Sequence, residues 1–268
     1  MNTRKTEKVV NNHLFNKNIL ATAVATAMFG AGVASAAVDV LVDTTVSTDN
    51  ATDFAIQSTN ILTIKGGATT TGYLSSFNGT IDGSMNATQG DGTGNIVIAG
   101  NLTMSGNIGS TNTTGNFTLN NGNTLVLADN LTTFNTANMS LKGNTVLNLG
   151  NATSGYNRSS GNALTMNANI TMASNSTINI GNGTTITGDI VGASSGQGTV
   201  NIVGNFTSGG NFGALSDKNG NSDLAQINIS KGNTFTISAN NVTSTRMNIN
   251  GTVTVAGNIT AAVTMGAD

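Results

Sequence analysis

The sequence predicts an all-β fold, a right-handed parallel β-helix (β-solenoid) whose coils take about 21 residues each. Three observations predict it. Apolar and polar residues alternate over short stretches, glycine turn phrases recur at nearly regular spacing, and Asn, Thr and Gly make up 119 of the 268 residues. Only 8% of the residues are charged, and β-branched residues are abundant. This combination is typical of repetitive β-structure with polar turns rather than of a disordered chain.

Short strands are predicted wherever apolar residues stand two positions apart, because such alternation gives a strand one buried face and one polar face. Helical spacing is not sustained after the predicted signal segment at the N-terminus. The predicted strands contain the pairs Ile96 and Ile98, Phe117 and Leu119, Leu125 and Leu127, Ile178 and Ile180, Val200 and Ile202, Ile227 and Ile229, Phe235 and Ile237, and Val253 and Val255.

These strands are separated by a recurring turn phrase. In this phrase, a Gly is followed by Asn or Thr and then by an apolar residue. The mean interval between its occurrences is about 21.5 residues, which is shorter than a propeller blade and more regular than the strands of a sandwich. A coil of a parallel β-helix has a suitable length. The phrase begins at Gly79, Gly100, Gly122, Gly143, Gly161, Gly183, Gly204, Gly232 and Gly251.

A longer echo supports the repeat. The stretch 196–213 matches the stretch 92–109 at nine of its eighteen positions, and the two lie close to five coils apart. We therefore expect Ile98 and Ile202 to occupy equivalent interior sites five coils apart, with Thr103 and Thr207 pointing outward. Asn and Thr side chains are expected to stack in ladders at equivalent turn positions.

Three regions are predicted along the chain. Residues 1–36 have the pattern of a signal peptide, with a basic start, an apolar run from Ile19 to Val33 and small residues at positions 34–36. This pattern predicts secretion across the inner membrane and cleavage after Ala36 or Ala37. Residues 37–78 lack the turn phrase and are expected to form an N-terminal cap region. Residues 79–268 are expected to form the β-solenoid.

Removal of the signal peptide would leave little catalytic chemistry. The only histidine, His13, and the only glutamate, Glu7, lie within it, and the chain has no cysteine. Nucleophilic schemes that use His or Cys are then excluded, and we expect no enzyme activity, no catalytic residues and no cofactor. The remaining charge of −5 argues against a nucleic-acid partner. A polysaccharide-cleaving alternative would gain support if Asp189, Asp217, Arg158 or Lys218 converged on one groove.

Weaker motifs favour ordinary turns. The stretch GDGTGN at residues 90–95 resembles one calcium-binding repeat but supplies too few carboxylates, so no metal site is expected. The glycosylation pattern at Asn101 is expected by chance in a chain so rich in Asn and Thr. Lys142, Lys218 and Lys231 stand near turns and are expected to be solvated.

The phrases GNLT at Gly100, GNAT at Gly150, GNFT at Gly204 and GNIT at Gly257 accompany the extended basic signal segment. Together they resemble the passenger region of bacterial autotransporter surface proteins, particularly the rickettsial-type outer-membrane surface antigens. The resemblance implies a secreted passenger displayed at the cell surface, often serving adhesion to a host-cell receptor. It also implies an outer-membrane barrel for translocation, which the chain lacks, so a fragment or truncated chain is expected.

Two functional classes remain open: a surface adhesin, and a structural surface-layer or fibre-type repeat protein. For the adhesin, the polar insertion at residues 213–223 is the expected projecting loop, because insertions into solenoids gather on one face.

Overall fold

The computed structural model describes residues 93–150, 155–159, 161–213, 222–237 and 241–266, together with the backbone of six short strands before Thr93. The expected signal peptide lies outside these residues. No helix occurs among the described residues, and so none that could span a membrane.

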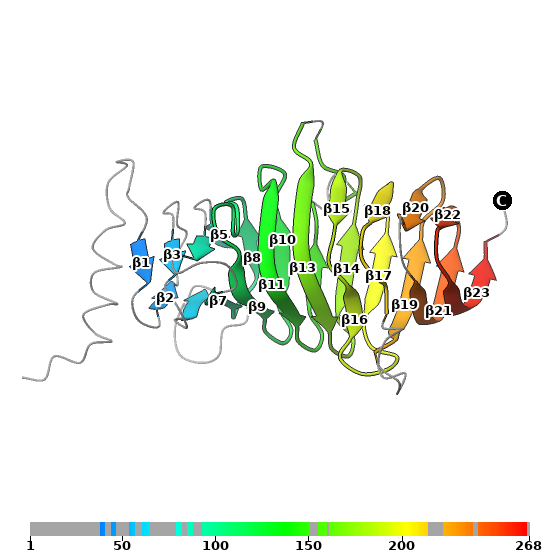
Figure 1. Cartoon of the computed structure of the whole chain (residues 1–268), viewed down its shortest axis with the longest axis horizontal. Coiled ribbons are helices and arrows are strands. Elements are labelled where there is room, and N and C mark those ends of the chain that lie inside the picture. Colours follow the sequence, from blue (N-terminus) through cyan, green and yellow to red (C-terminus); the bar gives the residue numbers. More distant parts are fainter. Residues whose placement is uncertain are drawn as a thin grey trace, which may run out of the picture.

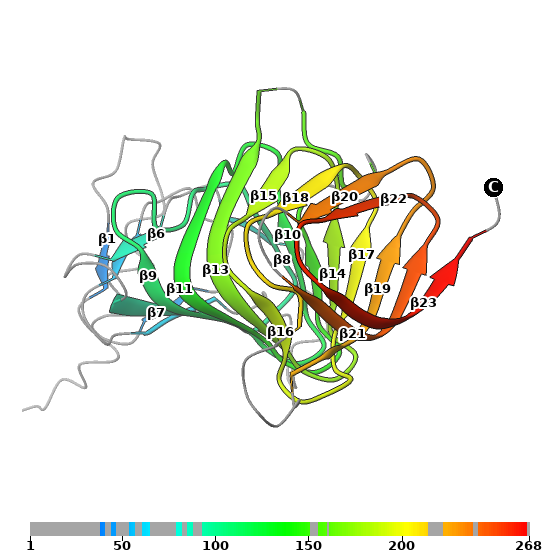
Figure 2. The same ribbon diagram turned by 45° about the vertical axis from the view of Figure 1, so that its right-hand side comes forward.

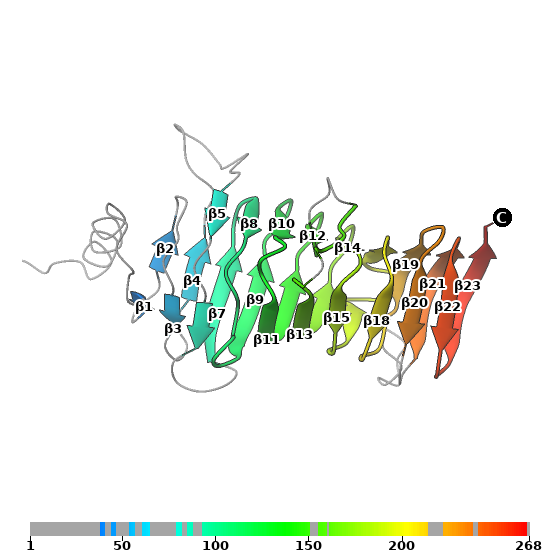
Figure 3. The same cartoon turned by 90° about the horizontal axis from the view of Figure 1, so that it is seen from above.

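The chain winds into stacked coils along one long axis, and each coil contributes strands to two long parallel sheets (Figures 1 and 3). The parallel β-helix predicted from the sequence is therefore confirmed. One sheet has nine strands: β5 (Gly79–Ile81), β8 (Leu102–Met104), β10 (Thr124–Leu127), β12 (Val146–Asn148), β14 (Thr177–Ile180), β17 (Thr199–Ile202), β19 (Leu224–Ile229), β21 (Val242–Ile249) and β23 (Ile259–Met265).

The second sheet has eleven strands, and it curves around the axis in Figure 2. Its members are β2 (Thr44–Val46), β4 (Ile61–Ile64), β7 (Thr93–Ile98), β9 (Thr114–Leu119), β11 (Thr133–Leu141), β13 (Leu164–Met172), β15 (Thr184–Ile186), β16 (Ile190–Gly192), β18 (Phe206–Ser208), β20 (Thr234–Ile237) and β22 (Thr252–Val255).

A three-stranded sheet lies at the N-terminal end and contains β1 (Val38–Val40), β3 (Phe54–Ile56) and β6 (Met85–Ala87). Parallel pairing also extends backwards from β7 to β4 and from β4 to β2. The backbone of the expected cap region, residues 37–78, therefore contributes strands to the same kind of ladder as the solenoid.

The hydrogen-bonded register of the nine-stranded sheet gives the length of each coil. From Asn179 to its partner Asn201, a coil without an insertion takes 22 residues. The step from Asn148 to Asn179 takes 31 residues, and the step from Asn201 to Asn228 takes 27. The longer of these two coils holds an insertion between β12 and β13 that the sequence pattern did not reveal. The other contains the expected projecting loop, of which residues 214–221 lie outside the described part.

The structure corrects the expected equivalence of the two echoed phrases. Ile98 lies on β7 of the eleven-stranded sheet, whereas Ile202 lies on β17 of the nine-stranded sheet. Both side chains are buried in the interior, as expected, but they do not occupy equivalent sites. Following the register back from Val200 on β17, through β14, β12 and β10, leads instead to Leu102, four coils earlier.

The reason is that each coil turns two corners with the same chemistry. Each corner consists of a tight polar turn between two strands. The turn phrase therefore does not distinguish one corner from the other. Gly100, Gly122 and Gly143 precede strands of the nine-stranded sheet, whereas Gly161 and Gly183 precede strands of the eleven-stranded sheet. The insertion between β12 and β13 shifts the phrase from one corner to the other.

The core is a narrow column of side chains enclosed by the sheets. Aliphatic residues repeat coil after coil, and phenylalanines form two clusters within the column. Phe206 and Phe235 are register partners whose rings stack with centroids 5.7 Å apart, and Phe212 packs edge-on against Phe235 at 5.0 Å. Some hydroxyl groups buried at the corners are satisfied locally: Thr145 donates to the carbonyl of Lys142 at 2.8 Å, and Ser176 donates to that of Ala173 at 2.6 Å.

The tight turns use residues that tolerate a left-handed backbone. Gly122 and Gly232 have φ values of 75° and 77° at opposite corners of the coil. Asn144 and Asn175 adopt φ values of 57° and 58° in the turns that follow β11 and β13. Asn accepts this conformation more readily than most residues, which explains why the turns are built from Gly and Asn.

Inward and outward positions should differ sharply in their tolerance of charge. We expect Ile202→Asp to lower the free energy of unfolding by several kcal/mol, because it places a carboxylate without a partner in the dry core. Thr207 is exposed, and Thr207→Asp should cost well under about 1 kcal/mol. Thermal unfolding of both variants, and of the matched pair at Ile98 and Thr103, measures the contrast. Equal losses at inward and outward sites would contradict the register.

Candidate ligand groove on the eleven-stranded sheet

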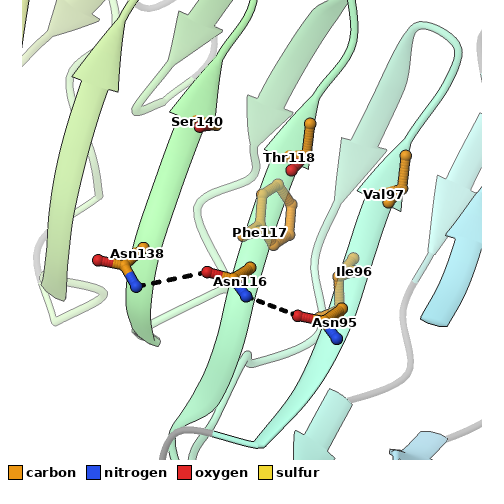
Figure 4. Close-up of a pocket in the computed structure, with 8 residues that line it drawn as sticks. All are labelled: Asn95, Ile96, Val97, Asn116, Phe117, Thr118, Asn138 and Ser140. Atoms are coloured by element: carbon orange, nitrogen blue, oxygen red, sulfur yellow. Dashed lines mark hydrogen bonds between the residues drawn. The ribbon is translucent and has the colours of Figure 1, made fainter. Parts of the chain in front are cut away.

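A groove of about 360 Å³ crosses β7, β9 and β11 on the eleven-stranded sheet (Figure 4). Its size lies within the range of small-ligand sites. The side chains that alternate outward along these strands supply its polar lining, while Ile96 and Phe117 are buried beneath it. The outward-facing lining residues are Asn95, Val97, Asn116, Thr118, Asn138 and Ser140.

Three asparagines form a ladder along one side of the groove. The Nδ2 of Asn116 donates to the Oδ1 of Asn95 at 2.8 Å, and the Nδ2 of Asn138 donates to the Oδ1 of Asn116 at 3.3 Å. The three residues are register partners on adjacent strands, so the ladder follows directly from the coil stacking. An amide group has two N–H donors and an oxygen with two lone pairs, and each step of the ladder uses one donor and one lone pair. The amide edges of Asn116 and Asn138, which are exposed, can therefore bond a ligand as well.

The second row of the groove combines hydroxyl groups with an apolar floor. Val97, Thr118 and Ser140 are successive register partners in this row. In the strand ladder between β11 and β13, the register shifts just before Asn138. A bulge of this kind bends the strand that carries it. The groove therefore lies beside this irregularity in the strand pairing and offers hydroxyl, amide and methyl groups.

A longer asparagine ladder covers the nine-stranded sheet. Four successive amide bonds of 2.8 Å each link Asn148, Asn179, Asn201, Asn228 and Asn248. The sequence predicts ladders only at turns, so these strand positions are an addition to the predicted ladders. A signal was present, because each asparagine stands between two apolar residues in the phrases LNL, INI, VNI, INI and MNI.

The expected turn ladder is also found, and it uses Asp189. The backbone N–H of Asp189 donates to the Oδ1 of Asn169 at 3.3 Å, and its own Oδ1 accepts from the backbone N–H of Asn211 at 2.7 Å. Asn241 and Asn258 continue the series through backbone N–H donors to the preceding side chain, at 3.2 and 3.1 Å. Asp189 therefore links one coil to the next.

Arg158, which was considered for a polysaccharide-cleaving site, is buried with 7% exposure. Its guanidinium donates to the carbonyl oxygens of Leu127, Ala128 and Leu131 in the preceding coil. Burial lowers the pKa of Arg158, and the nearby Asp129 carboxylate opposes that shift. The side chain joins the inserted segment to the turn beneath it.

The structure does not bring the four residues of the cleaving alternative together in the part that it describes. Arg158 and Asp189 bind different turns, and Asp217 and Lys218 lie outside the described residues. Within residues 93–266, leaving out the gaps, no three His, Cys, Asp or Glu side chains are grouped as a metal site would require.

The remaining motifs occupy ordinary positions. Residues 93–95 of the stretch GDGTGN open strand β7, and the rest of it is outside the described part. The Oδ1 of Asn101, in the glycosylation pattern, accepts from the backbone N–H of Thr124 at 2.8 Å. Lys142 and Lys231 are exposed at turns, as expected.

The strands that form the groove carry no formal charge. None of the eleven strands of this sheet contains Asp, Glu, Lys, Arg or His. Charged side chains stand next to these strands: Lys142 is exposed just past the end of β11, and Asp189 lies between β15 and β16, where it bonds Asn169 of β13.

Comparison of the chain with protein-family models, with curated proteins and with solved structures finds no match.

Arg158 gives a test of the inserted coil. We expect Arg158→Leu to lower the free energy of unfolding by about 3 kcal/mol, because buried carbonyls that lose their donor cost about 1–3 kcal/mol each. Lys142→Leu, at an exposed turn, should change it by less than about 0.5 kcal/mol. Urea unfolding measures both variants. A loss at Arg158 no larger than that at Lys142 would mean that these hydrogen bonds do not anchor the insertion.

Proposed function

We propose that the protein is a secreted, non-catalytic β-helical adhesin, displayed at the cell surface as an autotransporter passenger and binding the surface of host cells. The observation that carries the binding role is the groove over β7, β9 and β11. Asn116 and Asn138 present amide groups there that can form further hydrogen bonds, and Thr118 and Ser140 add hydroxyl groups. A rigid scaffold that holds such groups at fixed spacing is suited to recognition.

The chemistry of the described residues supports binding rather than catalysis. Arg158 and Asp189, the two of the four candidate charged groups that the structure describes, are both held in structural hydrogen bonds. Neither lines the groove. Reaction chemistry requires a positioned acid, base or nucleophile, and the groove residues offer amides, hydroxyls and an isopropyl group. Secretion and the autotransporter route are supported by the signal pattern in residues 1–36 and by the repeat style.

The alternative is a structural surface-layer or fibre-type repeat protein, and one observation favours it. Five asparagines form an unbroken ladder over the nine-stranded sheet, from Asn148 to Asn248. Regular ladders between stacked coils give a rigid rod, which suits a structural role. A structural role would depend on this ladder, whereas adhesion would depend on the groove.

Surface display and adhesion can be measured together. We expect antibodies to label the protein on intact producing cells, its recovered N-terminus to begin at Ala37 or Val38, and beads coated with it to bind cultured host cells at least fivefold more than albumin-coated beads. A protein that still begins at Met1 would contradict secretion. Beads that bind no better than the albumin control, together with concentration-dependent fibres in sedimentation, would favour the structural alternative.

A further inference from the structure

The groove over β7, β9 and β11 has a composition that selects among ligand classes. Its outward residues are Asn95, Val97, Asn116, Thr118, Asn138 and Ser140, and the strands on either side add no charge. A sulfated, phosphorylated or carboxylated ligand would lose water from its anionic groups, and no residue that lines the groove offers it a cationic partner. The exposed Lys142 stands two residues past Ser140, beyond the end of β11, and does not line the groove. Nucleic acids are disfavoured for the same reason.

A protein partner is also a poor match for this face. Protein–protein interfaces concentrate their binding energy in Trp, Tyr and Arg side chains. None of these residue types occurs in the eleven strands of the sheet, and its phenylalanines at positions 117, 134, 206 and 235 are buried. The face therefore lacks the anchors that a folded protein would engage.

A neutral polyhydroxyl chain fits the groups that are present. Sugar hydroxyls both donate and accept hydrogen bonds, and so do the amides of Asn116 and Asn138 and the hydroxyls of Thr118 and Ser140. Val97 supplies an apolar contact for the carbon face of a sugar ring. The chemical groups repeat from strand to strand at about 4.8 Å, so a ligand made of repeating units can meet similar partners in successive coils.

We propose that this groove binds a linear neutral polysaccharide whose chain crosses β7, β9 and β11 along the axis of the solenoid. The binding residues are the asparagine ladder on one side and the row of Val97, Thr118 and Ser140 on the other. The inference rests on the proposed adhesin, which it deepens by naming the class of ligand on the host surface.

The test compares two outward threonines of the same sheet. Thr118→Lys fills the groove with a long cationic side chain, whereas Thr207→Lys makes the same change on β18, at an exposed position that does not line the groove. Thr118→Ser keeps the hydroxyl group and serves as the conservative variant. Circular dichroism and the thermal midpoint establish that all three variants fold like the parent.

Affinity electrophoresis of the purified complete chain through gels containing amylose, mannan or laminarin measures binding, with heparin as the anionic probe. We expect at least one neutral polysaccharide to retard the parent, Thr118→Ser and Thr207→Lys to within twofold, and Thr118→Lys to bind at least tenfold more weakly. The proposal is overturned if none of the three retards the parent, if heparin retards it more strongly, or if both lysine variants bind equally.

The same variants separate this inference from the adhesin itself. Adhesion of coated beads to host cells that is lost in Thr118→Lys and kept in Thr207→Lys supports both proposals. Adhesion that persists unchanged in Thr118→Lys overturns the groove as the binding site while the adhesin stands. Polysaccharide binding in the gels without adhesion to cells overturns the adhesin and leaves the groove assignment in place.

Discussion

In-register parallel stacking is the constraint on which the rest of the structure depends. Each coil pairs its strands with the coil below and the coil above, so that a residue lies over its counterpart at about 4.8 Å. Identical residues stacked in one column must therefore be able to lie next to each other without repulsion. Like charges stacked in this way repel each other, whereas an amide donates on one side and accepts on the other. The asparagine ladders, such as the one from Asn148 to Asn248, satisfy this condition.

The same constraint shapes the surface on which function depends. Charged residues in the described part lie mostly at turns, where coils differ in length, and the eleven-stranded sheet contains none. The strands of this sheet thus present uncharged amides and hydroxyls, and the register between β11 and β13 shifts just before Asn138. The groove lies beside this shift, and its uncharged lining favours uncharged ligands.

Much of the fold could be predicted because the signals are local. Alternation around Ile96, Ile178 and Ile227 marks strands through a period of two, and each of these residues is buried. The register between coils could not be predicted from the sequence, because both corners of a coil use the same Gly and Asn turns. The phrase at Gly161 resembled an ordinary repeat, although it closes the insertion between β12 and β13. The hydrogen bonds of Arg158 and the groove beside Asn116 could not be predicted either. Both join residues of different coils, which are far apart in the sequence and meet only through the register.

Distances along a single column test the stacking most directly. Thr133, Thr165, Thr185, Thr207, Thr236 and Thr254 are successive register partners on the eleven-stranded sheet. The chain has no cysteine, so pairs of Thr→Cys substitutions can carry spin labels specifically. Pulsed electron paramagnetic resonance should give backbone separations of about 14 Å for Thr165 with Thr236, about 19 Å for Thr165 with Thr254 and about 24 Å for Thr133 with Thr254. Separations that do not increase with the number of coils, or that exceed about 35 Å, would contradict the stacked register.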